Sequence, residues 1–131
     1  YNDLPENLDT LSKSVVDCVF QVHQQIGPGF LEKIYEDCLC IEFKEKGLNF
    51  QRQYPIKFAY KGHDIQSDFR LDIVVEDQII LELKAVEKII PVHQAQIYSY
   101  LNITKMPLAF LIVFNVPLIK EGIKRYVPKS S

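Results

Sequence analysis

The stretch FRLDIVVEDQIILELK, residues 69–84, contains the clearest strand pattern in the chain. Apolar residues occupy its odd positions on both sides of a polar centre, and charged residues occupy even positions near its two ends. Alternation with a period of two is typical of β-strands, whose successive side chains point to opposite faces. The stretch therefore predicts two strands, Phe69 to Val75 and Ile79 to Lys84, joined by the turn Glu76-Asp77-Gln78.

Two acidic residues of this hairpin, Asp72 and Glu82, are predicted to face each other. If Val75 pairs with Ile79 across a three-residue turn, the two β-carbons lie roughly 5 Å apart, whereas a two-residue turn separates the acids onto opposite faces. Facing carboxylates repel each other unless a cation such as Lys84 or a divalent ion lies between them. The alternative is a solvated polar face balanced by basic neighbours. Oxygen ligands without convergent His or Cys favour Mg²⁺ or Mn²⁺ over zinc.

The elements after the hairpin are a helix and two strands. Pro91 favours the first turn of a helix that reaches about Asn102. Residues 108–114 form a continuous apolar run, which predicts a strand buried on both faces. Residues 118–127 predict a last amphipathic strand with a basic character.

The elements before the hairpin begin with two helices. Apolar residues between Leu11 and Ile26 recur every three or four positions, and the sequence Gly27-Pro28-Gly29 ends that helix. A second helix is predicted from Phe30 to Lys46. Extended segments follow, with Pro55 favouring an edge position or a bulge, a turn at 61–62 and a short strand over 65–68. The order helix, helix, strands, helix, strands predicts a mixed α/β sandwich, one domain over residues 1–131.

The composition narrows the class of protein. The 131 residues are 47% hydrophobic and 24% charged, ordinary globular values that exclude a disordered or fibrous chain. No apolar run approaches the ~18 residues that a membrane span needs. A net charge of −2 is the wrong sign for a protein whose whole surface grips nucleic acid. The three cysteines show no metal-ligand spacing, so we interpret them as reduced thiols, which predicts a cytoplasmic protein.

Four further polar residues lie on the predicted helices. Glu32 falls inside the apolar arc of the second helix, where a carboxylate is either desolvated beside a cation or hydrogen-bond donors, or exposed in the first turn and stabilised by the helix dipole. His93, Gln96 and Tyr100 are spaced i, i+3, i+7 and share one helix face. That face is either part of a site or an ordinary polar surface.

At this point the motifs match a known pattern. Residues Gly29 to Tyr35 spell Gly-x-x-Glu-x-x-Tyr, which resembles the signature of the GxxExxY proteins, a family of the PD-(D/E)XK nuclease superfamily. Asp72, Glu82-Leu83-Lys84, His93 to Gln96 and Tyr100-Leu101 follow in the same order. Val113-Phe114 departs from the Asn-Phe that the family carries. The resemblance covers nearly the whole chain and implies a restriction-endonuclease-like core, a central mixed β-sheet flanked by helices.

The resemblance also implies a catalytic group. By analogy with the superfamily, Glu32, Asp72 and Glu82 would hold one or two Mg²⁺ (or Mn²⁺) ions. Lys84 would orient or help to deprotonate the attacking water, or stabilise charge on the phosphorane. A divalent ion lowers the pKa of bound water and neutralises charge on phosphate oxygens, which fits these roles.

The substrate-binding residues are implied in the same way. Gln96 and Tyr100 resemble the Gln-x-x-x-Tyr element of the exonuclease-like branch, which is expected to position substrate or the metal shell, and Tyr35 and His93 complete the predicted substrate-binding set. The expected function is a metal-dependent nuclease that hydrolyses phosphodiester bonds of DNA, less often RNA. The alternatives are a non-catalytic nucleic-acid-binding or protein-interaction module on the same fold, and a homo-oligomer whose elements pair between subunits.

Overall fold

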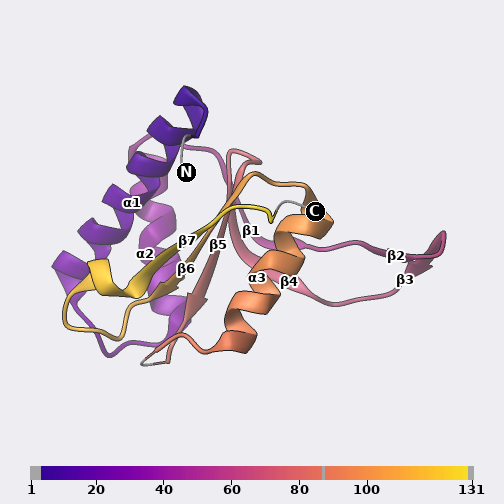
Figure 1. The fold of residues 1–131 in the computed structure, drawn as a ribbon. Coiled ribbons are helices and arrows are strands. Elements are labelled where there is room, and N and C mark those ends of the chain that lie inside the picture. The colour runs from indigo at the N-terminus through magenta and orange to yellow at the C-terminus, as the bar shows by residue number, and fades with distance from the viewer. Residues whose placement is uncertain (1–3, 87, 130–131) are drawn as a thin grey trace.

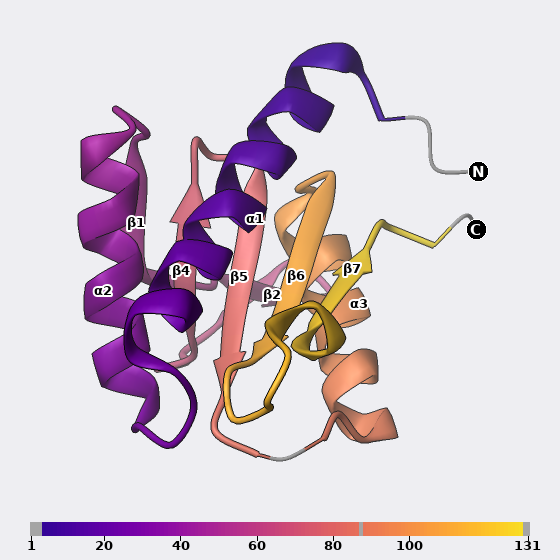
Figure 2. The same ribbon diagram turned by 90° about the vertical axis from the view of Figure 1, so that its left-hand side faces the viewer.

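The central feature of the fold is a five-stranded sheet between two layers of helices. The computed structural model describes residues 4–86 and 88–129. Helices α1 and α2 cover one face of the sheet and α3 covers the other, as Figures 1 and 2 show from two sides. In chain order the elements are α1 (Glu6–Ile26), α2 (Glu32–Glu45), β1 (Phe50–Pro55), β2 (Phe58–Tyr60), β3 (His63–Ile65), β4 (Arg70–Val75), β5 (Ile79–Lys84), α3 (Pro91–Thr104), β6 (Leu108–Val113), the 3-10 helix η1 (Ile119–Gly122) and β7 (Ile123–Tyr126).

The strand order across the sheet is β1-β4-β5-β6-β7. All neighbours are antiparallel except β5 and β6, which are parallel and are joined across one face by α3. A parallel pair needs such a crossover because its strands start at the same edge of the sheet. The expected α/β architecture with a mixed central sheet is confirmed.

The hairpin register is also confirmed. Val75 pairs with Ile79, and three residues form the turn between them. Glu76 and Asp77 take left-handed conformations with φ of 53° and 56°, and the Gln78 N–H donates to the Val75 carbonyl at 3.0 Å. This turn places the odd hairpin positions 73, 75, 79, 81 and 83 in the core under α1 and α2.

The other face of the hairpin is apolar near the turn and acidic at the far end. Val74 and Ile80 belong to a second core under α3, together with Tyr100 and Leu101. The even positions nearest the turn are therefore buried as well, and within β4 and β5 charged residues lie only where β4 begins and β5 ends.

Two predicted strands differ from the structure. The strand expected over 65–68 is instead β3, which pairs with β2 in a separate ribbon whose turn, Lys61-Gly62, is left-handed at both residues (φ 49° and 80°). The strand expected over 118–127 shortens to β7, since residues 119–122 form η1. At Gly122 a Cβ would lie 2.0 Å from the Val113 carbonyl oxygen, so the chain passes too close to β6 for any side chain.

The remaining boundaries differ by a few residues. Helix α2 begins at Glu32 rather than Phe30, and α3 runs on to Thr104. Strand β1 is an edge strand, as Pro55 indicated. The single domain over residues 1–131 stays a prediction, and residues 1–3, 87 and 130–131 of that range lie outside the described part of the chain.

The cysteines and the helices bear on two further expectations. Cys18, Cys38 and Cys40 are free, and burial raises the pKa of Cys18 and Cys40 to about 11, which suits packed thiols. Over residues 4–86 and 88–129, no helix is both long enough and apolar enough to cross a membrane. The cytoplasmic location stays a prediction.

Candidate active site

The candidate site begins where the main-chain ladder between β4 and β5 ends. Its last pair is Ile73 with Leu81, although β4 stays paired with β1 as far as Arg70 and β5 stays paired with β6 as far as Lys84. Beyond that pair the strands are joined by side chains. The Asp72 N–H donates to Glu82 Oε1 at 3.0 Å, and the Leu83 N–H donates to Asp72 Oδ2 at 2.8 Å. Two side-chain carboxylates thus accept the N–H hydrogen bonds that main-chain carbonyl oxygens accept in a regular ladder.

The two carboxyl groups share a water-poor environment. Glu82 is only 7% exposed, and burial, reinforced by the charge of Asp72, raises the pKa of Glu82 to about 8. Burial also raises the pKa of Asp72 to about 6, against the lowering effect of the Leu83 N–H, with Glu36 and Glu32 adding to the rise. The pair therefore retains a proton near neutral pH unless a cation joins it.

Glu32 reaches the same end of β5 from the other helical layer. It is the first residue of α2, and its Oε2 accepts the N–H of Ala85, the residue after Lys84, at 2.9 Å. The side chain is exposed rather than desolvated, so the first-turn alternative is the one observed. Three predicted ligands, from α2, β4 and β5, are thereby brought to one region.

Lys84 lies two residues after Glu82 on β5 and is half-buried. The alternation of the strand directs both side chains toward the same face. The charge of Lys84 lowers the pKa of both Asp72 and Glu82, although burial outweighs it. Lys84 is thus the cation that acts on the acidic pair from within β5.

A cleft of about 710 Å³ opens beside this group. Its lining comes from α2, β1, β4 and the residue after β5: Leu31, Glu32, Lys33, Glu36, Arg52, Gln53, Asp72 and Ala85. The predicted ligands Glu32 and Asp72 face the same space. Glu82 and Lys84 are not among the residues that line this cleft.

Sequence reasoning missed one polar cluster on the cleft wall. Glu36, 8% exposed, accepts Arg52 Nε at 2.8 Å on one oxygen and Gln53 Nε2 at 3.1 Å on the other. Arg52 also pairs with Asp37. Glu36 lies one helical turn after Glu32, a spacing that could have indicated a shared face, whereas nothing in the sequence indicated Arg52.

Residues of α3 approach the acidic pair from the layer of helices opposite to α2. Tyr100 is buried, and burial raises the pKa of its phenol to about 12, with the charges of Glu82 and Asp72 contributing. Gln96, one turn earlier, is half-buried. His93 Nδ1 instead accepts the Ile90 N–H at 3.2 Å, so this ring caps the start of α3.

Tyr35, the remaining residue of the predicted substrate-binding set, lies in the core. The side chain is 2% exposed, and its ring stacks on Phe114 with centroids 4.1 Å apart and planes 3° apart. Its hydroxyl donates to the Gly27 carbonyl at 2.7 Å and accepts the Phe30 N–H at 3.2 Å. Tyr35 therefore closes the loop before α2, the helix that begins with Glu32, and its place in the substrate-binding set stays a prediction.

The donor chemistry of the site fits a hard divalent cation. Glu32, Asp72 and Glu82 offer carboxylate oxygens, and an ion would relieve the repulsion that raises the pKa of the two strand acids. Across residues 4–86 and 88–129, however, no three Asp, Glu, His or Cys side chains already stand as a ligand group. The residues therefore match a divalent cation in charge and in donor atoms. To bind one, the carboxylates would have to give up their hydrogen bonds to main-chain N–H groups.

The comparisons with known proteins gave one match. A family model described as the PD-(D/E)XK nuclease superfamily matches residues 9–126, which include every residue of the group around Asp72. Searches of curated proteins and of solved structures gave no match. The match is to the superfamily, so membership of the GxxExxY family stays a prediction.

Proposed function

The chain belongs to the PD-(D/E)XK nuclease superfamily, and we propose that it is a divalent-metal-dependent nuclease that hydrolyses phosphodiester bonds of DNA. The observation that supports this most is the acidic pair at the end of the β4–β5 ladder. Two carboxyl groups side by side in a water-poor environment, with Lys84 two residues after Glu82, lower the stability of a sheet. A sheet with a purely structural role has no need of such a group.

In this proposal Glu32, Asp72 and Glu82 hold Mg²⁺ or Mn²⁺. The bound ion would lower the pKa of a water molecule and neutralise charge on the scissile phosphate. Each protein ligand comes from a different element, so the ion would also tie α2 to the sheet. Loss of the retained proton as the ion binds would make metal affinity rise with pH.

Lys84 acts as a fixed positive charge beside the phosphate. The water oxygen attacks phosphorus and gives up a proton to solvent, the bond from phosphorus to the leaving sugar oxygen breaks, and that oxygen takes up a proton from solvent. Negative charge grows on the other phosphate oxygens during the step. An ammonium group stabilises that charge without transferring a proton. Its half-buried position strengthens the effect, because fewer water molecules screen it.

The residues of α3 position the substrate. The phenol of Tyr100 stays protonated near neutral pH and can donate a hydrogen bond toward the acidic side of the sheet. Gln96 lies one turn nearer the start of the helix, where its amide can both donate and accept. His93 stays in the substrate-binding set only if substrate displaces its bond to the Ile90 N–H.

One observation favours a second function, a non-catalytic nucleic-acid-binding or protein-interaction module. Asp72 and Glu82 each accept a main-chain N–H, which is a stable use for these carboxylates without a metal. A module of this kind would bind Mn²⁺ weakly and would cleave nothing. Metal affinity and cleavage therefore separate the two functions.

The experiment is a cleavage assay with supercoiled, linear and single-stranded DNA in Mg²⁺ and in Mn²⁺. Lys84→Ala, purified in parallel, is the control for contaminating nuclease. Cleavage by the wild type alone supports the enzyme, and the preferred DNA form identifies endonuclease or exonuclease action. Absence of metal-dependent cleavage with every DNA, together with weak Mn²⁺ binding, contradicts it in favour of the module.

A further inference from the structure

The ribbon formed by β2 and β3 stands away from the body of the protein. It connects β1 to β4 and projects beyond α3 in Figure 1. Within the described residues these two strands pair with each other and with no other strand. A two-stranded ribbon with no third strand is marginally stable in water, so a projecting one with an apolar surface suggests a ligand.

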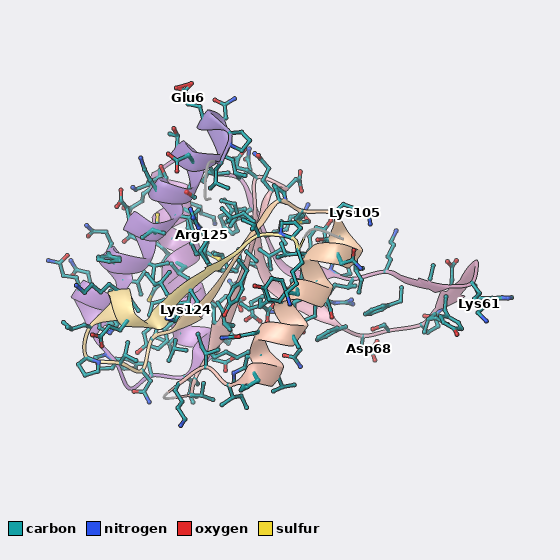
Figure 3. The ribbon with its side chains drawn as sticks, in the orientation of Figure 1. Glu6, Lys61, Asp68, Lys105, Lys124 and Arg125 are labelled. Carbon is teal, nitrogen blue, oxygen red and sulfur yellow. The ribbon has the colours of Figure 1, made fainter. Side chains whose placement is uncertain are left out.

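The surface of the ribbon combines exposed aromatic rings with charges of both signs: Lys61 lies at the tip, Asp64 on β3, and Asp68 on the segment that returns to β4. Tyr60 pairs with His63, and Tyr60 is 64% exposed, the most exposed aromatic ring among the described residues. The Lys61 ammonium lies 5.6 Å from the centre of that ring. Figure 3 shows Lys61 at the far end of the ribbon, pointing away from the body. Rings and lysines in this combination bind single-stranded nucleic acid, because rings stack on bases and ammonium groups pair with phosphates.

The base of the ribbon is continuous with the candidate active site. Phe69, 40% exposed, immediately precedes β4 and packs edge to face on Tyr100, with ring centroids 5.1 Å apart. Asp72 follows three residues later on the same strand. The extended chain from Gly62 to Arg70 can span up to ~25 Å. A strand of nucleic acid lying along the ribbon would therefore run toward the acidic pair.

We propose that the β2–β3 ribbon is a binding arm for single-stranded nucleic acid. Tyr60 and Phe69 stack on unpaired bases, and Lys61 contacts a phosphate. The choice of nucleic acid as the ligand rests on the proposed function. The ribbon adds that the nucleic acid is single-stranded and names residues outside the cleft that bind it. A nuclease with such an arm acts on single strands or on unpaired ends in preference to closed duplex.

The test measures binding without cleavage, by fluorescence anisotropy of labelled oligo(dT) in metal-free buffer. Tyr60→Ala removes the ring, and Tyr60→Phe keeps it as the matched control. One stacked base corresponds to a roughly 5- to 150-fold loss of affinity, so Tyr60→Ala falls in that range and Tyr60→Phe stays close to wild type. Lys61→Asn, which suits the left-handed turn, lowers the slope of log affinity against log salt by ~0.7. Lys13→Ala, on α1, leaves both quantities unchanged.

Three results would overturn the arm. The first is that the wild-type protein does not bind oligo(dT), and the second is that Tyr60→Ala binds it as tightly as wild type. The third is that Tyr60→Ala changes only the sedimentation of the protein, which would indicate that a second copy of the chain covers the ribbon. The cleavage assay is independent of these results. Tyr60-dependent binding without cleavage retains the arm and rejects the nuclease, whereas equal cleavage by wild type and Tyr60→Ala with equal binding does the reverse.

Discussion

The carboxylates of Asp72 and Glu82 each accept a hydrogen bond from the main chain of the opposite strand. The Leu83 N–H donates to Asp72 at 2.8 Å, and the Asp72 N–H donates to Glu82 at 3.0 Å. The exchange occurs just beyond the last main-chain pair of β4 and β5, where each strand remains paired only with its other neighbour. It keeps two acids together that would otherwise separate. The following predictions depend on this relationship and on the residues around it.

Asp72→Asn is expected to weaken Mn²⁺ binding and to reduce the metal-induced rise in Tm. The amide keeps an oxygen that can accept the Leu83 N–H, so the fold is retained while one negative charge is lost. Calorimetric titration and thermal melts with and without Mn²⁺ measure the two effects. A variant with full metal affinity would show that Asp72 is no ligand.

Glu82→Gln is expected to stabilise the metal-free protein in alkaline buffer. The pKa of Glu82 is raised from 4.5 to about 8 in the folded state, so its contribution to stability is fully present below pH 4.5 and is lost as pH rises through about 8. A neutral amide avoids that loss. Melts in EDTA should show a Tm gain over wild type of several degrees at about pH 8 and little gain at about pH 5. Equal Tm differences at both pH values would contradict the raised pKa.

Lys84→Ala is expected to abolish cleavage while folding and Mn²⁺ binding persist. Lys84 supplies charge beside the phosphate and is not a ligand in the proposal. Cleavage assays and Mn²⁺ titrations of one preparation separate the two properties. Turnover equal to that of wild type would remove Lys84 from the mechanism.

Tyr35→Phe is expected to lower stability by about 1 kcal/mol and to weaken Mn²⁺ binding, although Tyr35 is not among the proposed metal ligands. The ring still stacks on Phe114, but the hydroxyl that donates to the Gly27 carbonyl and accepts the Phe30 N–H is lost. Chemical denaturation gives the first effect and titration the second. If metal affinity is unchanged, the hydroxyl stabilises the loop without positioning Glu32.

Much of the sheet could be predicted because its pattern is local. A period of two predicted the strands, but it left the turn at either two or three residues. The structure has the three-residue turn between Val75 and Ile79, the alternative that brings Asp72 and Glu82 together. The parallel pairing of β5 and β6 required a crossover long enough for a helix, and α3 was visible from Pro91 onward.

The depth of individual side chains could not be predicted in the same way. A helical wheel gives the direction of a side chain but not what lies opposite it. Glu32 therefore seemed a candidate for desolvation yet is exposed at the start of α2, while Tyr35 seemed available to substrate yet lies against Phe114. The cluster of Glu36 and Arg52 joins residues from α2 and β1, and no local pattern reports such a pairing.

The close approach of Gly122 to β6 restricts how this protein can vary. A methyl group at position 122 would collide with the Val113 carbonyl, and Val113 is the neighbour of Lys84 across the parallel pair. Substitution there would displace the end of β6 and with it the backbone that carries the lysine. A position far from Lys84 in the sequence thus bears on where that lysine lies, and we expect Gly122 to tolerate few substitutions in a mutational scan of the chain.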